Sequence, residues 1–142
     1  MNILDTRDLQ TRLDELEALR DAVTEAWEEL TAAVADESRE HEREELSAAH
    51  DAAQDEFGED EQTELAEIEE ISTATSSFRD GEAMIPVEDF EEYAEQLAED
   101  IGAIDRNASW PANHIDWTAA AKALSQDYTE VSYQGTDYYV RA

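Results

Sequence analysis

The sequence predicts a mainly α-helical protein that ends in a small α+β module. Through the first 70 residues, apolar side chains recur every three or four positions, which is the spacing of one face of an α-helix. Near the C-terminus, residues 129–140 instead alternate polar side chains with β-branched or aromatic ones around Gln134 and Gly135. That alternation is typical of a β-hairpin. We therefore expect a long N-terminal helical hairpin, then two helices and a C-terminal β-hairpin.

Length and charge limit the functions open to the chain. Its 142 residues suffice for one domain, or for a small domain with a helical appendage. Thirty-nine acidic residues against nine basic ones give a net charge of -30, and Lys122 is the single lysine. This charge repels nucleic acid and anionic membranes and attracts basic surfaces. Three Trp and five Tyr in a chain that is 41% hydrophobic indicate a folded protein and not an acidic disordered tail.

The first helix is expected to begin at Thr6, acting as N-cap with Asp8 in the first turn, and to run for about 30 residues, or roughly 45 Å. We interpret its apolar stripe as a packing seam with Trp27 in the core. An exposed remainder of the stripe could support a homodimer. The stripe consists of Leu9, Leu13, Leu16, Leu19, Val23, Trp27, Leu30 and Val34.

A second helix is expected to be capped by Ser38 and to carry a thinner apolar stripe. The two helices form an antiparallel hairpin that turns near Asp36 and is kinked or broken near Gly58. We assign residues 1–72 to this acidic hairpin and the Ser/Thr-rich residues 73–82 to a linker. The thinner stripe consists of Leu46, Ala49, Ala53, Phe57, Leu65, Ile68 and Ile71.

Residues 83–142 are expected to form the α+β module. A helix after Pro86 places Phe90, Tyr93, Ala94, Leu97 and Ile101 on one face and ends at Gly102, where a left-handed C-cap is least costly. Asp116 is the predicted N-cap of a helix from Trp117 to about Asp127. We expect Trp117 and Leu124 to be buried against Tyr93 and Leu97.

Two segments of this module carry a resemblance to a known family. "FEEYAEQLAEDIGAI" followed by "IDWTAAAKALSQDYTEVSYQGTDYYVR" resembles the C-terminal module of the antirestriction protein ArdA, over about residues 87–141. The shared features are an acidic helix ending in a Gly-containing turn, an Ile-Asp-aromatic helix start, a spaced Asp before the final hairpin, and an aromatic-rich last strand. The N-terminal half has no counterpart in that family.

The resemblance implies an elongated, often dimeric DNA mimic made by phages and mobile elements. In that family, carboxylates stand in for DNA phosphates in the DNA-binding groove of type I restriction-modification enzymes. The charge of this chain agrees with such a role. Residues 1–80 carry a net charge of -20. Along a hairpin of roughly 50 Å this is about one charge per 2.5 Å, against one per ~1.7 Å in duplex DNA.

Two groups of carboxylates are the candidate phosphate surrogates. Residues 36–70 hold sixteen carboxylates against two arginines and no lysine. The helix after Pro86 has a row of glutamates that are spaced four, three and four residues apart. Such rows destabilise their own helix, so a basic partner that relieves the repulsion would explain them. The candidate residues are Glu40, Glu44, Glu45, Asp51, Asp55 and Glu56 in the first group and Glu88, Glu92, Glu95 and Glu99 in the second.

The sequence thus predicts an acidic DNA-mimic anti-defence protein, whose partner is the basic DNA-binding groove of a host restriction-modification enzyme or of a CRISPR effector. The alternative is a non-catalytic coiled-coil adaptor or assembly protein whose acidity serves solubility or a high-salt habitat. Eight arginines to one lysine are typical of proteins from such habitats. A salt-dependent pull-down separates the two hypotheses.

Catalysis is not expected. His41 in "HEREE" lacks the second histidine of H-E-x-x-H, and no nucleophile elbow, phosphate loop or EF-hand pattern is present. Without cysteine there is no disulfide framework and no Cys-based metal or thiol site. We predict no cofactor, no metal, no direct nucleic-acid binding and no membrane partner. The N-terminal "MNILDTRDLQ" lacks the features of a secretory signal, and no apolar run reaches 18 residues, so we expect a soluble protein of the host cytoplasm.

Overall fold

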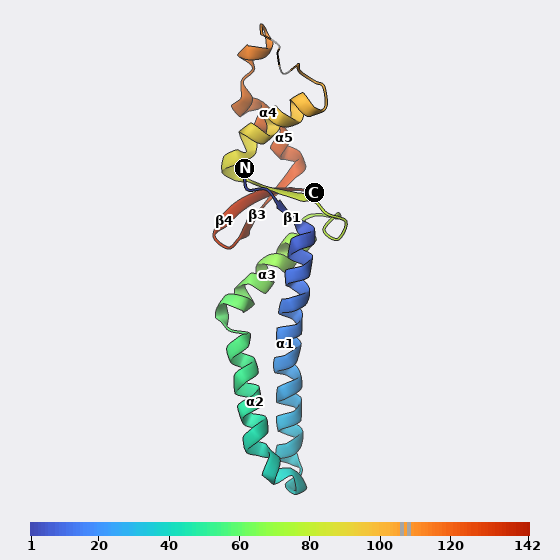
Figure 1. Ribbon diagram of the computed structural model, residues 1–142, viewed down its shortest axis with the longest axis vertical. Helices are drawn as coiled ribbons and strands as arrows, with labels where there is room; N and C mark the ends of the chain where they lie inside the picture. The colour runs from blue at the N-terminus through green and yellow to red at the C-terminus, as the bar shows by residue number, and fades with distance from the viewer. Residues whose placement is uncertain (106, 108) are drawn as a thin grey trace. The chain divides into compact units, whose positions relative to one another are not determined.

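The computed structural model describes residues 1–105, 107 and 109–142, and these fall into two compact units. One unit comprises Leu9–Glu69, and the other combines Met1–Asp8 with Glu70–Ala142. The prediction of a mainly α-helical chain with a small α+β module is confirmed, since 67% of the described residues are helical and their strands form one four-stranded antiparallel sheet. Figure 1 shows the elements in order along the chain.

The unit of residues 9–69 is a helical hairpin. Helix α1 (Thr6–Ala35) has the expected length of 30 residues, and the 3₁₀ turn η1 (Glu37–Glu42) reverses the chain into α2 (Arg43–Glu56). Helix α3 (Glu59–Ala74) follows, and α2 and α3 run back along α1 (Figure 1). The break expected near Gly58 is confirmed, because Phe57 leaves helical geometry with φ -103° and ψ 64° before α3 begins.

Both predicted N-caps of the hairpin were wrong: Thr6 by one residue, and Ser38 because the second helix, α2, begins only at Arg43, after Glu42, which makes no side-chain capping bond. Asp5, not Thr6, caps α1, because its Oδ1 accepts a hydrogen bond from the backbone N–H of Arg7 at 2.9 Å. Asp36, not Ser38, caps η1, and its Oδ1 accepts from the Ser38 N–H at 3.0 Å and from the Ser38 hydroxyl at 2.7 Å. In each case a short carboxylate just before the first helical residue outcompetes the hydroxyl that follows it.

The prediction that Trp27 lies in the core is wrong, because 53% of its surface is exposed. The buried side of α1 changes along the helix: Leu16 and Ala33 are both fully buried, yet at 100° per residue they lie about 100° apart around the axis. Trp27 follows Leu16 by eleven residues, or three turns, and so continues the line of Leu16 to within about 20°. That line is covered near Leu16 but not near Trp27, and Val34 is exposed as well.

The second unit is built on a sheet of four strands: β1 (Leu4–Asp5), β2 (Ala83–Pro86), β3 (Tyr128–Tyr133) and β4 (Thr136–Arg141), in the order β1-β2-β4-β3. The predicted hairpin β3–β4 is confirmed, and both of its turn residues have positive φ, 49° at Gln134 and 81° at Gly135. Strands β1 and β2 were not predicted. They are too short to show an alternating pattern, and their pairing, Leu4 with Met84, spans most of the chain.

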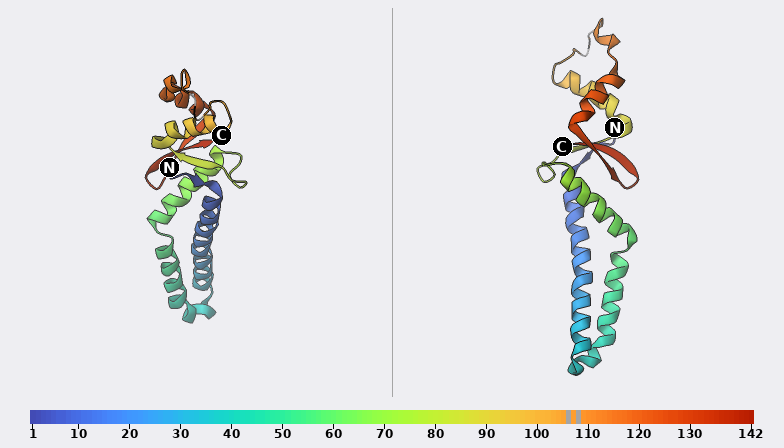
Figure 2. Two further views of the ribbon diagram at one scale, coloured as in Figure 1. Left: turned by 45° about the horizontal axis from the view of Figure 1, so that its top comes forward. Right: turned by 180° about the vertical axis from the view of Figure 1, so that it is seen from behind.

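Two helices, α4 (Phe90–Asp100) and α5 (Trp117–Leu124), pack against this sheet, and Figure 2 shows them from two further directions. Short 3₁₀ turns flank them: η2 (Val87–Asp89), η3 (Ala112–His114) and η4 (Ser125–Asp127). The core between helices and sheet consists of Ile85, Phe90, Ala94 and Ala121. Leu124 and Tyr93 both pack against this core, but Leu124 and Trp117 are half-buried and not buried as expected.

The helix ends of this unit agree with the sequence. Gly102 has φ +76°, and the bonds from its N–H to Glu99 O and from Ala103 N–H to Ala98 O form a Schellman C-cap. Asp116 caps α5 by accepting from the Ala119 N–H at 3.1 Å. The segment expected as a linker, residues 73–82, is packed: Thr75 and Phe78 are buried, and the Thr6 hydroxyl donates to the Phe78 carbonyl at 2.8 Å.

Candidate acidic binding surface

Helix α2 buries none of its side chains. Its apolar side is a half-buried seam of Leu46, His50 and Ala53 that continues to Phe57. At 100° per residue, Glu44, Asp51 and Asp55 fall within about 40° of one another on the face opposite this seam. All three are exposed. The sequence-predicted residues Glu44, Asp51 and Asp55 therefore form one outward row about 16 Å long.

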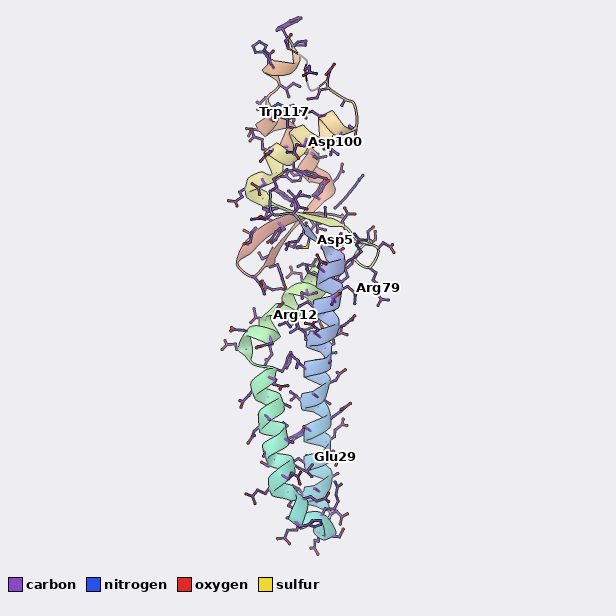
Figure 3. The ribbon with its side chains drawn as sticks, in the orientation of Figure 1. Asp5, Arg12, Glu29, Arg79, Asp100 and Trp117 are labelled. Carbon is purple, nitrogen blue, oxygen red and sulfur yellow. The ribbon has the colours of Figure 1, made fainter. Side chains whose placement is uncertain are left out.

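The other three predicted residues of this region are also exposed but lie elsewhere on it. Glu45 and Glu56 are eleven residues apart, so they share a second row about 100° from the first. Glu40 belongs to the 3₁₀ turn η1 at the end of the hairpin. The six carboxylates thus occupy two faces of α2 and the turn before it, and Figure 3 shows the side chains of α2 projecting around the helix.

The four arginines of residues 9–69 leave this surface largely uncompensated. Arg12 pairs with Glu64 of α3, and Arg20 forms longer pairs of 3.6 Å with Asp21 and 3.5 Å with Glu69. At the turn, Arg39 bridges Glu29 and Glu42, and Arg43 donates to the carbonyls of Ala33 and Val34. Within the described part of the chain, Asp51 alone of the six predicted carboxylates lies near a basic side chain, with its Oδ1 4.0 Å from His50 Nδ1.

At the turn, local hydrogen bonds keep two carboxyls ionised to lower pH than usual. The pKa of Asp36 is lowered by the hydrogen bonds from the Ser38 side chain and N–H. The pKa of Glu42 is lowered by the hydrogen bond that Arg39 donates. Both groups are solvent-exposed, so these shifts fix the negative charge of the turn more than they stabilise the fold.

The second predicted group lies in the other unit. Glu92, Glu95 and Glu99 project from α4 on the side opposite the buried Phe90 and Ala94. Glu92 and Glu95 are exposed and Glu99 is half-buried. Glu88, expected as the first member of the same helical row, sits instead in the 3₁₀ turn η2. Three carboxylates therefore share the outer face of α4, and Glu88 precedes it.

The sequence reasoning missed one exposed aromatic group in the hairpin. The Trp27 ring lies 5.2 Å from the His50 ring, centroid to centroid, at an interplanar angle of 47°. Val23, Thr24 and Gln54 complete a shallow depression around this pair. The break at Gly58 was the available signal, because it divides the chain that faces α1 into two helices. Trp27 and Leu16 lie on the same line of α1, but periodicity alone cannot tell which part of that line the two helices cover.

Among residues 1–105, 107 and 109–142, no three His, Asp or Glu side chains are placed to hold a metal ion. Of the helices formed by these residues, none combines the length and apolarity that crossing a bilayer requires.

Comparison of the chain with protein-family models, with curated proteins and with solved structures finds no significant match. The resemblance of residues 87–141 to the ArdA module therefore stays a prediction, and the fold and surface described above are the basis for assigning a function.

Proposed function

We propose that this protein is an acidic inhibitor that mimics DNA and occupies the basic DNA-binding groove of a host defence enzyme. The first target we propose is a restriction-modification enzyme. The second is a CRISPR effector, whose nucleic-acid groove is also positively charged. The protein acts by binding and not by catalysis, in the host cytoplasm. Its carboxylates take the places of DNA phosphates along the groove.

The observation that carries this proposal is helix α2. A surface helix normally owes its stability to an apolar face buried by tertiary packing. Helix α2 buries no side chain, yet it carries carboxylates on two faces. The arginines of the hairpin lie mainly at the two ends of the hairpin, with Arg39 and Arg43 at the turn and Arg12 near the other end. Folding stability alone does not favour such a sequence, because like charges four residues apart destabilise a helix. A basic groove compensates that repulsion on binding.

Inhibition by a graded series of neutralised variants tests the proposal. Two, four and then all six of the carboxylates Glu40, Glu44, Glu45, Asp51, Asp55 and Glu56 are replaced by Gln or Asn, and inhibition of DNA cleavage by a host type I restriction enzyme is measured. We expect inhibition to weaken progressively, and duplex DNA to compete with the unmodified protein for the enzyme. The matched control exchanges Glu and Asp at the same six positions, which keeps every charge and should keep inhibition.

A second candidate function is a non-catalytic coiled-coil adaptor or assembly protein whose acidity serves solubility or a high-salt habitat. The exposed apolar side chains Trp27 and Val34 on α1 favour it, because they offer a partner helix a place to pack. Here the partner should be held equally well at low and high salt, since burial of apolar surface is not screened. Binding indifferent to salt would decide for this second function. Full inhibition by the six-fold neutralised variant would instead show that these six carboxylates are a solvated face and that the inhibitory surface lies in the module from Pro86 onward.

A further inference from the structure

The Trp27–His50 pair is the one place on the acidic hairpin where a large aromatic surface faces solvent. More than half of Trp27 is exposed, and its ring is held against His50, which reaches it from α2. Together with Val23, Thr24 and Gln54, the pair lines an open depression. The indole is thus positioned by neighbours from two helices and is still accessible.

Charge restricts what can cover this depression. Asp51 follows His50, and its Oδ1 lies 4.0 Å from His50 Nδ1 while most of its side chain faces solvent. Residues 9–69 as a whole carry 22 carboxylates against four arginines, a net charge of -18. A second copy of the hairpin would bring the same charge to the contact and be repelled. The complementary occupant is cationic.

Among cationic side chains, arginine suits an exposed indole best. Its guanidinium is planar, more weakly hydrated than an ammonium group, and stacks on an indole face. Lysine offers a compact, strongly hydrated charge that stacks less well. An exposed indole in a strongly acidic hairpin is therefore a better receptor for arginine than for lysine.

We infer that Trp27, held against His50, is a docking point for an arginine side chain of the basic partner. This inference rests on the proposed function, because the partner's basic groove supplies the arginine. It adds a contact that duplex DNA lacks and that depends less on salt than the carboxylate rows do. Removing the indole should weaken binding of the partner about 5-fold to 30-fold, with the loss most visible at high salt.

A titration followed by NMR tests the docking point without the partner. Arginine-only and lysine-only peptides of equal length are added to the full-length ¹⁵N-labelled protein, and the indole N–H resonances are followed as salt is raised. The Trp27 signal is assigned by its loss in Trp27→Phe. We expect both peptides to perturb it at low salt and only the arginine peptide at high salt.

Trp110 provides an internal control, because it is 78% exposed and also lies on this chain. If stacking on any exposed indole were the cause, Trp110 should respond to the arginine peptide as strongly as Trp27. That result, or equal responses of Trp27 to the two peptides at high salt, would overturn the inference.

The partner itself separates this inference from the proposed function. Trp27→Leu keeps an apolar side chain at the site, and Val34→Ala removes another exposed apolar side chain of α1 as a matched control. We expect only Trp27→Leu to weaken inhibition of the restriction enzyme, with the circular dichroism of both variants unchanged. Salt-sensitive inhibition that Trp27→Leu leaves intact refutes the docking point and keeps the proposed function, whereas no inhibition by the unmodified protein refutes the proposed function. Concentration-dependent dimerisation lost in Trp27→Leu would assign the patch to a second copy and overturn the inference.

Discussion

Arg12 and Glu64, 52 residues apart in the sequence, are joined by two parallel hydrogen bonds: Arg12 Nε donates to Oε1 at 2.9 Å and Nη2 to Oε2 at 3.1 Å. Figure 3 labels Arg12 on α1. The Glu64 side chain is only 10% exposed and that of Arg12 37%. In a hairpin with a large excess of carboxylates, this pair ties α1 to α3 more closely than the 3.5 Å pair of Arg20 with Glu69 does.

Replacing Arg12 by Met should destabilise the protein. The change deprives a nearly buried carboxylate of two charge-assisted hydrogen bonds, and we expect a loss of about 1–3 kcal/mol in the free energy of unfolding. The value lies below that for a fully buried pair because water reaches Arg12. Urea denaturation measures it. The control is Glu15→Gln, which removes only the exposed pair of Arg12 and should cost less than about 1 kcal/mol. Equal losses for both variants would contradict the prediction.

The Thr6 hydroxyl should be worth more than an ordinary surface hydroxyl. Thr6 is fully buried, donates to the Phe78 carbonyl at 2.8 Å and accepts from the Glu82 N–H at 2.8 Å. Thr6→Val keeps the shape but leaves two backbone groups without this partner, so we expect a loss of about 1–3 kcal/mol. Thr24→Val, at an exposed hydroxyl that bonds within its own helix, should stay within about 0.5 kcal/mol in the same thermal or urea unfolding experiment.

Two glycines with positive φ should differ in their tolerance of a methyl group. At Gly135, with φ +81°, a Cβ would meet no atom within 4 Å, so Gly135→Ala should cost only the backbone strain of about 1–2 kcal/mol. At Gly81, with φ +103°, a Cβ would lie 2.7 Å from Arg7 Nε. Gly81→Ala should therefore cost more and should also displace Arg7 from Asp5. Because Arg7 lowers the pKa of Asp5, that pKa should rise in Gly81→Ala and stay unchanged in Gly135→Ala, as followed by NMR.

The turn of the hairpin should be sensitive to acid through Glu42. Its folded pKa is lowered by Arg39, so the stability that this pair contributes is present above the ordinary glutamate pKa and is lost as the pH falls through the folded value. Arg39→Gln should return the pKa of Glu42 toward the ordinary value in a ¹³C NMR titration. Arg12→Met, which removes an arginine with no contact to the turn, should leave it unchanged. A Glu42 pKa that is not lowered in the unmodified protein would refute the prediction.

Neutralising the outward row of α2 should not harm the fold. Glu44, Asp51 and Asp55 repel one another along one face, and a like-charge pair four residues apart costs about 0.2–0.5 kcal/mol. The triple change to Gln, Asn and Asn should leave the midpoint of thermal unfolding equal or higher, with the gain largest at low salt. Glu42→Gln, which removes the partner of Arg39, should lower it instead. A triple variant less stable than the unmodified protein would show that the row has a structural role.

The local structure of this protein could be predicted from its sequence wherever neighbouring residues decide it. The length of α1, the break at Gly58, the Asp116 cap, the Gly102 C-cap and the β3–β4 hairpin all depend on side chains within a few positions of one another. The exposure of the α2 carboxylates could likewise be predicted, because charged side chains that face away from the apolar seam of a helix lie in solvent. Which of these carboxylates binds a partner stays a prediction.

Only the tertiary structure decided how distant segments meet. Strand β1 consists of two residues and exists because Met84 lies opposite Leu4, so no local pattern could reveal it. The pairing of Arg12 with Glu64 depends on the position of α3. That position cannot be predicted from the sequence, because the break at Gly58 does not determine in which direction α3 continues. The same freedom decides which line of α1 is covered. Leu16 and Trp27 are equivalent in the helical repeat, but an apolar side chain is stabilised by the neighbours that remove it from water. These neighbours cover Leu16 completely and leave 53% of Trp27 exposed.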